Sequence, residues 1–107
     1  MNEKQFIKTT NLTPHDLVVN DHWIPASGEV ARVTQGFSEI IDGVCQQTFG
    51  EIEGLPDPQE GVRFIVSGLV FAATDRPDVF APATGHPGVI RNQAGHIVSV
   101  PCLVGRV

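Results

Sequence analysis

Basic residues are scarce in this chain. Its 107 residues include 7 lysines and arginines against 12 aspartates and glutamates, which gives a formal net charge of −5 at pH 7. Proteins that bind duplex nucleic acid or an anionic membrane surface need a basic footprint, so this balance argues against both functions. A small anionic ligand is still compatible, because two or three cations at one site are enough to hold it.

Cysteine is also rare, and the histidines are scattered. Cys45 and Cys102 lie far apart in apolar neighbourhoods, which predicts two reduced thiols with a packing role rather than a disulfide. The four histidines lie in separate segments, and none belongs to an HxH, HExxH or CxxC arrangement. These spacings predict neither a metal site nor a metal cofactor.

The motifs of several common enzyme classes are missing. The sequence contains no GxSxG, no Walker A motif and no dinucleotide-binding fingerprint. No apolar run approaches the roughly 20 residues of a membrane span. The first residues show no signal-peptide pattern, so we expect a cytoplasmic protein with no membrane partner. With 41% apolar and 18% charged residues, the chain is expected to form a single folded domain over residues 1–107.

Turn-forming residues, in contrast, are abundant. Eleven glycines and eight prolines divide the chain into short β-branched runs, which are typical of strands. We therefore expect a mostly β fold, a small antiparallel sheet or barrel-like domain, with one short helix capped by Ser67. Asp42-Gly43 between two apolar runs predicts a hairpin, and residues 50–61 read as a polar, proline-rich loop. The expected strands cover residues 5–9, 16–19, 22–24, 29–34, 37–41, 44–49, 62–66, 79–81, 89–92 and 96–104.

The first polar segment with binding potential is Asn11-Leu12-Thr13-Pro14-His15. It places three polar side chains on one irregular stretch between strands, and loops held on a sheet commonly carry binding groups. One interpretation is that Asn11, Thr13 and His15 face a pocket. In the alternative, Asn11 and Thr13 satisfy the backbone of the turn and His15 lies on the surface.

The second polar segment runs from Thr74 to Arg91. Its two arginines, its threonines and its glycine-backed amides suit the recognition of a phosphate. In the alternative, Arg76 forms an ordinary surface ion pair with Asp75 or Asp78. Taken together with Arg32, the two segments predict one pocket for an anionic nucleotide. Its expected lining is Asn11, Thr13, His15, Arg32, Arg76, Asp78, Thr84 and Arg91.

Several of these stretches resemble a known family. Asn11-Leu12-Thr13-Pro14-His15 and residues 24–32, 54–58, 64–67, 76–79 and 82–85, with Arg91, resemble a small family of mostly hypothetical proteins carried by phages and by many bacterial genomes. A small, acidic, loop-rich phage protein is similar in kind to anti-defence proteins that bind the nucleotide signals of bacterial immunity. The resemblance implies a homo-oligomer that sequesters a cyclic ADP-ribose-like molecule or a cyclic dinucleotide in the cytoplasm of the host cell.

Two other functions are left open by the sequence. One is a metal-independent phosphodiesterase that cleaves such a signal, with His15 as general acid or base. The other is a small structural phage protein, which the β-rich sequence suits equally well. Because no catalytic motif is present, we expect a binding protein rather than an enzyme, and no cofactor.

Overall fold

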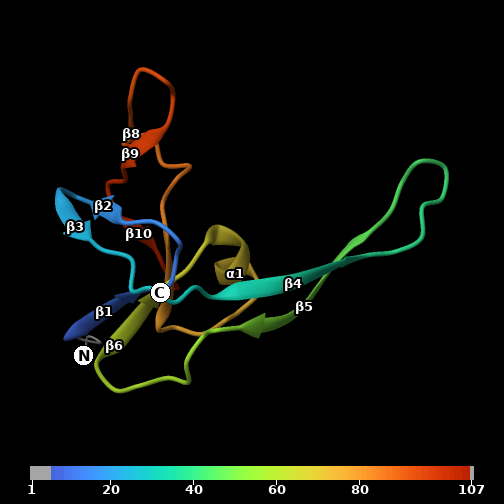
Figure 1. The fold of residues 1–107 in the computed structure, drawn as a ribbon, viewed down its shortest axis with the longest axis horizontal. Coiled ribbons are helices and arrows are strands. Elements are labelled where there is room, and N and C mark those ends of the chain that lie inside the picture. Colours follow the sequence, from blue (N-terminus) through green and yellow to red (C-terminus); the bar gives the residue numbers. More distant parts are fainter. Residues whose placement is uncertain (1–5, 107) are drawn as a thin grey trace.

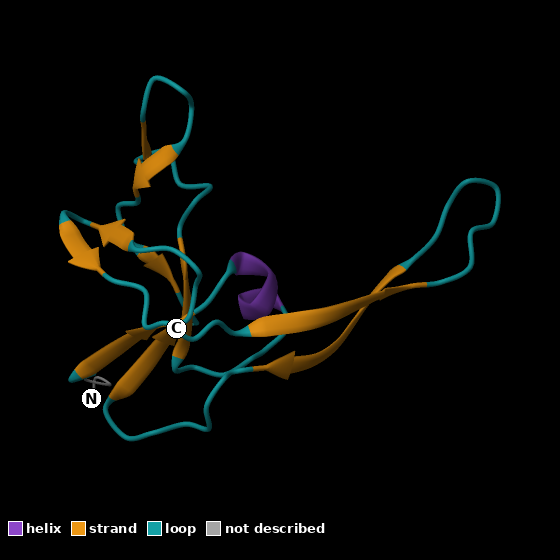
Figure 2. Ribbon diagram, viewed as in Figure 1, coloured by secondary structure: helices purple, strands orange, loops and turns teal. Residues whose placement is uncertain are grey.

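The computed structural model describes residues 6–106, and it confirms a mostly β fold with one short helix in this part of the chain (Figures 1 and 2). Gln5, where the first strand was expected to begin, lies outside the described residues. The strands are β1 (Lys8–Asn11), β2 (Leu17–Val19), β3 (His22–Ile24), β4 (Arg32–Phe37), β5 (Gln47–Glu53), β6 (Val62–Ile65), β7 (Val79–Pro82), β8 (Ile90–Arg91), β9 (Ile97–Ser99) and β10 (Leu103–Val104), and helix α1 covers Gly68–Ala72.

The central sheet has four strands in the order β1-β6-β7-β10. β1 pairs with β6 and β6 with β7 in parallel, whereas β10 runs antiparallel to β7. The sequence analysis did not anticipate these parallel pairs, since parallel strands are joined by long crossovers rather than by a recognisable tight turn. The crossover between β6 and β7 contains α1, and the one between β1 and β6 contains the hairpins β2–β3 and β4–β5.

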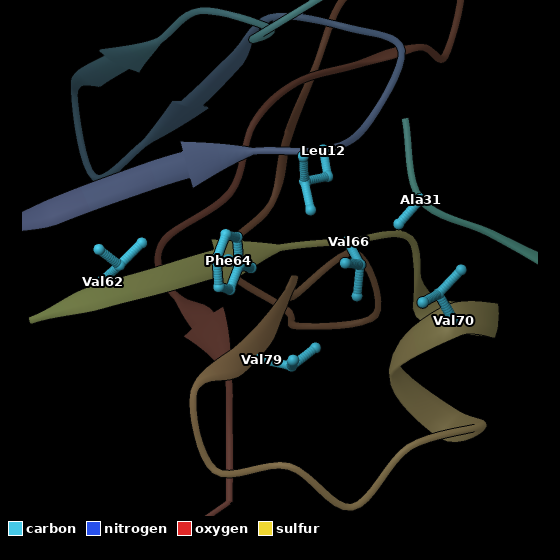
Figure 3. Packing of buried hydrophobic residues seen from close by; sticks show 7 residues of the cluster. All are labelled: Leu12, Ala31, Val62, Phe64, Val66, Val70 and Val79. Carbon is cyan, nitrogen blue, oxygen red and sulfur yellow. The ribbon is translucent and has the colours of Figure 1, made fainter. Parts of the chain in front are cut away.

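The core lies between this sheet and α1. Phe64 of β6 and Val79 of β7 are almost fully buried, and they form one cluster with Leu12 after β1 and Val70 of the helix (Figure 3). Along β6, Val62 and Phe64 alternate with Arg63, so the sheet turns one apolar face toward the helix. The buried cluster therefore holds the ends of β1, β6 and β7 at fixed positions.

Helix α1 begins where the sequence predicted it would. The Ser67 hydroxyl accepts a hydrogen bond from the Val70 backbone N–H at 3.3 Å, which confirms the N-cap. At the other end, the Arg106 guanidinium donates to the carbonyls of Phe71 and Thr74 and stacks 4.0 Å from the centre of the Phe71 ring. This contact ties the C-terminal segment to the helix.

Strands β4 and β5 form a long hairpin, residues 32–53, which we call the arm. At its tip, Asp42 and Gly43 both have positive φ, 53° and 77°, as a type I′ turn requires, which confirms the predicted turn. The strands expected at residues 37–41 and 44–49 were placed too near the turn, because β4 ends at Phe37 and β5 begins at Gln47. The expected loop at residues 50–61 begins later than predicted, because β5 continues to Glu53. Ile52 pairs with Val33 there, and both side chains pack against the core.

The arm extends away from the rest of the molecule (Figures 1 and 2). The radius of gyration is 15.8 Å, whereas a compact domain of about 100 residues has a value of about 13 Å. The root of the arm is fixed to the core through Val33 and Ile52, but every residue from 37 to 51 is exposed. The outer part of the arm is therefore held only by the pairing of its own two strands.

Two smaller hairpins lie near the C-terminal end of β7. β2 pairs with β3 through a turn at Asn20 and Asp21, and β8 pairs with β9. A bridge between Val19 and Val100 joins the two hairpins. The expected strand over residues 96–104 is instead divided into β9 and β10 around Pro101, because proline cannot donate a ladder hydrogen bond.

Candidate functional site

The Asn11–His15 segment is held together by its own polar groups. The Asn11 side chain donates to the carbonyls of His15 and Ile24 at 2.9 and 3.2 Å, and it accepts from both the backbone N–H and the hydroxyl of Thr13. Asn11 is 1% exposed and Thr13 is 7% exposed. Both side chains therefore stabilise the loop, as the alternative interpretation stated, whereas the His15 side chain is exposed.

Arg76 and Asp78 satisfy one another. The guanidinium donates Nε to Oδ1 at 3.1 Å and Nη2 to Oδ2 at 2.7 Å, and its Nη1 donates to the Pro56 carbonyl at 2.8 Å. The structure thus shows the ion pair between Arg76 and Asp78 that the sequence analysis gave as the alternative. Both side chains are largely buried. The physical role of the ion pair is to fasten the loop before β6 to the start of β7.

The other arginines lie at separate places. Arg63 donates to the Thr9 hydroxyl at 2.8 Å, and its guanidinium lies 6.0 and 5.6 Å from the ring centres of Phe6 and Phe80. Arg91 is exposed on β8 and donates Nη1 to the Gly95 carbonyl at 2.8 Å. Arg32 is exposed at the root of the arm, where it pairs in register with Glu53 of β5. Arg63, Arg76 and Arg91 therefore bind different groups.

The polar groups that do converge lie beyond the carboxyl end of β7. His15 and Thr84 line one hollow of about 230 Å³, between the hairpins β2–β3 and β8–β9. Asp16 and Ser99 also line it, and Leu17 belongs to its apolar wall. The carboxyl ends of parallel strands are the usual location of ligand sites in open sheets, so this hollow is the best candidate site.

A second hollow of about 350 Å³ adjoins the first. The two share Pro82 and Thr84, and the second is also lined by His86, Cys102 and Phe71. Small-molecule sites occupy roughly 300–1,000 Å³, and the second hollow falls within that range. Thr84 lines both hollows.

The eight predicted residues are divided among several places. His15 and Thr84 share one hollow, and Arg76 and Asp78 line another near Pro58. Thr13 and Arg32 line a third, of about 250 Å³, beside α1. Arg91 lies near the candidate site, because its register partner Ile97 is part of the wall. Asn11 is enclosed in its own loop.

Sequence reasoning missed Ser99, Asp16 and Cys102 as lining residues. Ser99 comes from the last hairpin, and no local motif marks it. Both cysteines are free and exposed, so the expected packing role was wrong for each. Cys45 lies in the outer arm, and Cys102 opens into the second hollow. Val44 beside Cys45 is 67% exposed, and Pro101 and Leu103 beside Cys102 are only half-buried, so apolar neighbours in the sequence did not imply burial.

Residues 6–106 contain neither a metal-binding cluster nor a membrane-spanning helix. These residues contain no group of three or more histidine, cysteine, aspartate or glutamate side chains placed to hold a metal ion. No helix among them is long and apolar enough to cross a membrane.

Comparisons with known proteins add no assignment. No protein-family model matches the chain, and neither the curated proteins nor the solved structures contain a match. The resemblance to the phage and bacterial family is therefore still a prediction from the sequence.

Proposed function

We propose that this chain is a phage-type anti-defence protein that sequesters a small phosphate-containing nucleotide signal in the host cytoplasm. The ligand class is a cyclic ADP-ribose-like molecule or a cyclic dinucleotide, and the protein acts as a homo-oligomer. The observation that carries the proposal is the convergence of His15 and Thr84, from the two polar segments of the sequence, on one hollow at the carboxyl end of the parallel strands.

The lining of the two hollows suits the parts of such a ligand. The Thr84 and Ser99 hydroxyls and the His15 imidazole would bond ribose hydroxyls and base edges. Apolar side chains such as Leu17 and Phe71 would contact the faces of the bases. The phosphates would meet Arg91, which uses only Nη1 internally and keeps its other N–H groups available.

Sequestration is favoured over cleavage by the state of His15. Its imidazole makes no hydrogen bond within residues 6–106, although a general acid or base is normally oriented by a second group. Asp16 is its chain neighbour, but the Asp16 carboxylate accepts from the Ala26 backbone N–H at 2.8 Å instead. An unoriented histidine suits a ligand contact better than proton transfer.

Calorimetric titration with cyclic ADP-ribose isomers and cyclic dinucleotides tests the proposal. Wild type should bind at least one of them, and Thr84→Val and Arg91→Ala should each weaken binding by about tenfold or more. Lys8→Ala is the control, since Lys8 is exposed on β1 away from both hollows. Failure of wild type to bind any member of either class would overturn the proposal.

Recovery of the ligand distinguishes binding from catalysis. After incubation and denaturation of the protein, a sequestered nucleotide is recovered unchanged. If wild type instead yields a linear or hydrolysed product, and His15→Ala yields none, the protein is a phosphodiesterase and the sequestration proposal is wrong.

A structural subunit of a phage particle is the second candidate. The observation in its favour is the arm, which exposes large apolar side chains far from the candidate site. That function predicts copurification with particles and no heat of binding with either nucleotide class.

A further inference from the structure

The first hollow, which His15 and Thr84 share, also contains a carboxylate that the proposed function does not use. Asp16 lines this hollow, and its side chain is exposed to solvent rather than enclosed by the protein. A carboxylate accepts hydrogen bonds and donates none. Asp16 therefore favours a ligand group that carries N–H or O–H donors.

The Asp16 carboxylate is held in a fixed position. Its Oδ1 accepts a hydrogen bond from the Ala26 backbone N–H at 2.8 Å, which ties the residue before β2 to the chain after β3. Next to Asp16, the His15 carbonyl accepts from the buried Asn11 side chain at 2.9 Å. Each carboxylate oxygen has two lone pairs, so both Oδ1 and Oδ2 can still accept a hydrogen bond from a ligand.

The walls of the first hollow are mostly apolar. Leu17 and Val18 come from β2, and Ile97 comes from β9. A hydrogen bond of 3.0 Å from the Val100 N–H to the Val18 carbonyl holds these two walls together. At about 230 Å³, the hollow is smaller than the roughly 300–1,000 Å³ of a whole small-molecule site, so it suits one part of a nucleotide. A base, with apolar faces and a polar edge, fits such walls better than a ribose or a phosphate.

Guanine is the base whose donors match a carboxylate. Its Watson–Crick edge presents the N1–H and N2–H groups side by side, so each carboxylate oxygen can accept one hydrogen bond. Adenine presents one N–H donor beside the acceptor N1, and N1 would face a carboxylate oxygen that also only accepts. Uracil presents a single N–H between two carbonyls, and it is disfavoured for the same reason.

The other polar groups of the hollow match the remaining edge of guanine. Its O6 and N7 are acceptors, and the hydroxyls of Thr84 and Ser99 can donate to them. The negative charge of Asp16 repels a phosphate group, so the phosphates would lie outside this hollow, toward Arg91. Charge and hydrogen bonding therefore both place a base, rather than a phosphate, beside Asp16.

We propose that the first hollow binds a guanine base through Asp16, and that the sequestered signal is a cyclic dinucleotide that contains guanine. This inference rests on the proposed function and narrows its two ligand classes to one, because the base of cyclic ADP-ribose is adenine. Asp16 is the residue that determines which base is bound.

Calorimetric titration with cyclic di-GMP and cyclic di-AMP tests the assignment, because these ligands share one ribose–phosphate ring and differ only in the base. Wild type should bind cyclic di-GMP at least about tenfold more tightly than cyclic di-AMP. Asp16→Asn should reduce this ratio to about threefold or less, because its amide N–H₂ would face the donors of guanine. Its amide oxygen can still accept from the Ala26 N–H, so the hairpin is retained. Asp21→Asn is the matched control, since Asp21 is exposed at the turn of the same hairpin, and it should keep the wild-type ratio.

Cyclic di-IMP supplies a second readout. Its base, hypoxanthine, keeps O6 and N1–H but lacks the 2-amino group, so wild type should bind it about tenfold more weakly than cyclic di-GMP. Asp16→Asn should no longer prefer cyclic di-GMP over cyclic di-IMP.

The outcomes separate this inference from the proposed function. If cyclic di-AMP binds wild type as tightly as cyclic di-GMP, or if Asp16→Asn keeps the wild-type ratio, the guanine assignment is wrong. If wild type binds only isomers of cyclic ADP-ribose, the guanine assignment is wrong and the proposed function holds. If wild type binds no nucleotide of either class, both are wrong.

Discussion

Arg76 and Asp78 stand two positions apart and face each other through two nitrogen–oxygen contacts of 3.1 and 2.7 Å. The third branch of the guanidinium reaches the Pro56 carbonyl, so the arginine joins the loop at residues 54–61 to the start of β7. The side chains are 22% and 8% exposed. The pair thus has a structural role, which separates it from the phosphate contact that the sequence predicted.

We expect Arg76→Ala to destabilise the fold by about 3 kcal/mol, because it removes two charge-assisted hydrogen bonds from the buried Asp78 carboxylate. Urea denaturation measures the change. Asp75→Asn, at an exposed neighbouring residue, should change the free energy of unfolding by less than about 0.5 kcal/mol. If Arg76→Ala keeps the wild-type free energy of unfolding but loses affinity for the nucleotide, Arg76 binds the ligand and the structural role is wrong.

Asn11→Ala should cost about 3 kcal/mol or more of stability. The substitution removes four hydrogen bonds from a residue that is 1% exposed, and the buried Thr13 backbone N–H loses its acceptor. His15→Ala, in the same loop but exposed, serves as the comparison and should be nearly neutral. Equal stability of the two variants would contradict the structural role of Asn11.

Gly54→Ala should be destabilising by about 1–3 kcal/mol. Gly54 follows β5 with a φ of 79°, and a Cβ there would lie 2.6 Å from the Val30 carbonyl oxygen. Gly85→Ala is the control, since a Cβ added at Gly85 would have no neighbouring atom within 4 Å. Thermal unfolding of the two variants gives the comparison, and an unchanged midpoint for Gly54→Ala would argue against this close approach.

Ser67→Ala should cost about 1 kcal/mol, because it removes the acceptor for the Val70 N–H at the start of α1. Ser67→Asp should retain most of the stability, since aspartate also accepts at this position. If the alanine and aspartate variants unfold at the same urea concentration, the cap contributes nothing measurable.

Local signals in the sequence predicted local structure well. Asp42-Gly43 predicted the turn of the arm, because few other residue pairs adopt two positive φ angles. Ser67 predicted the start of α1, because its hydroxyl can accept from a backbone N–H of the first helical turn. The strand predicted at residues 62–66 was recognisable from its β-branched and aromatic residues, and β6 covers Val62–Ile65 of it.

Non-local features were not accessible in the same way. The parallel pairing of β1 with β6 joins residues separated by two hairpins, and no turn motif encodes it. The sequence placed Arg76 near polar neighbours but did not show that its guanidinium would bind both Asp78 and the Pro56 carbonyl. The hollow at His15 and Thr84 depends on Ser99 and Val100, whose contribution follows only from how the last hairpin packs.

The central claim is that the hollows around Thr84 hold an intact nucleotide signal. Its most direct test is mass spectrometry of the small molecules released on denaturation, after the protein has been expressed beside active nucleotide-signalling systems. The proposal predicts an uncleaved cyclic nucleotide from wild type and from Lys8→Ala, and a strong loss of it from Thr84→Val combined with Arg91→Ala. Wild-type protein that releases no nucleotide, or a double variant that releases as much as wild type, would contradict it.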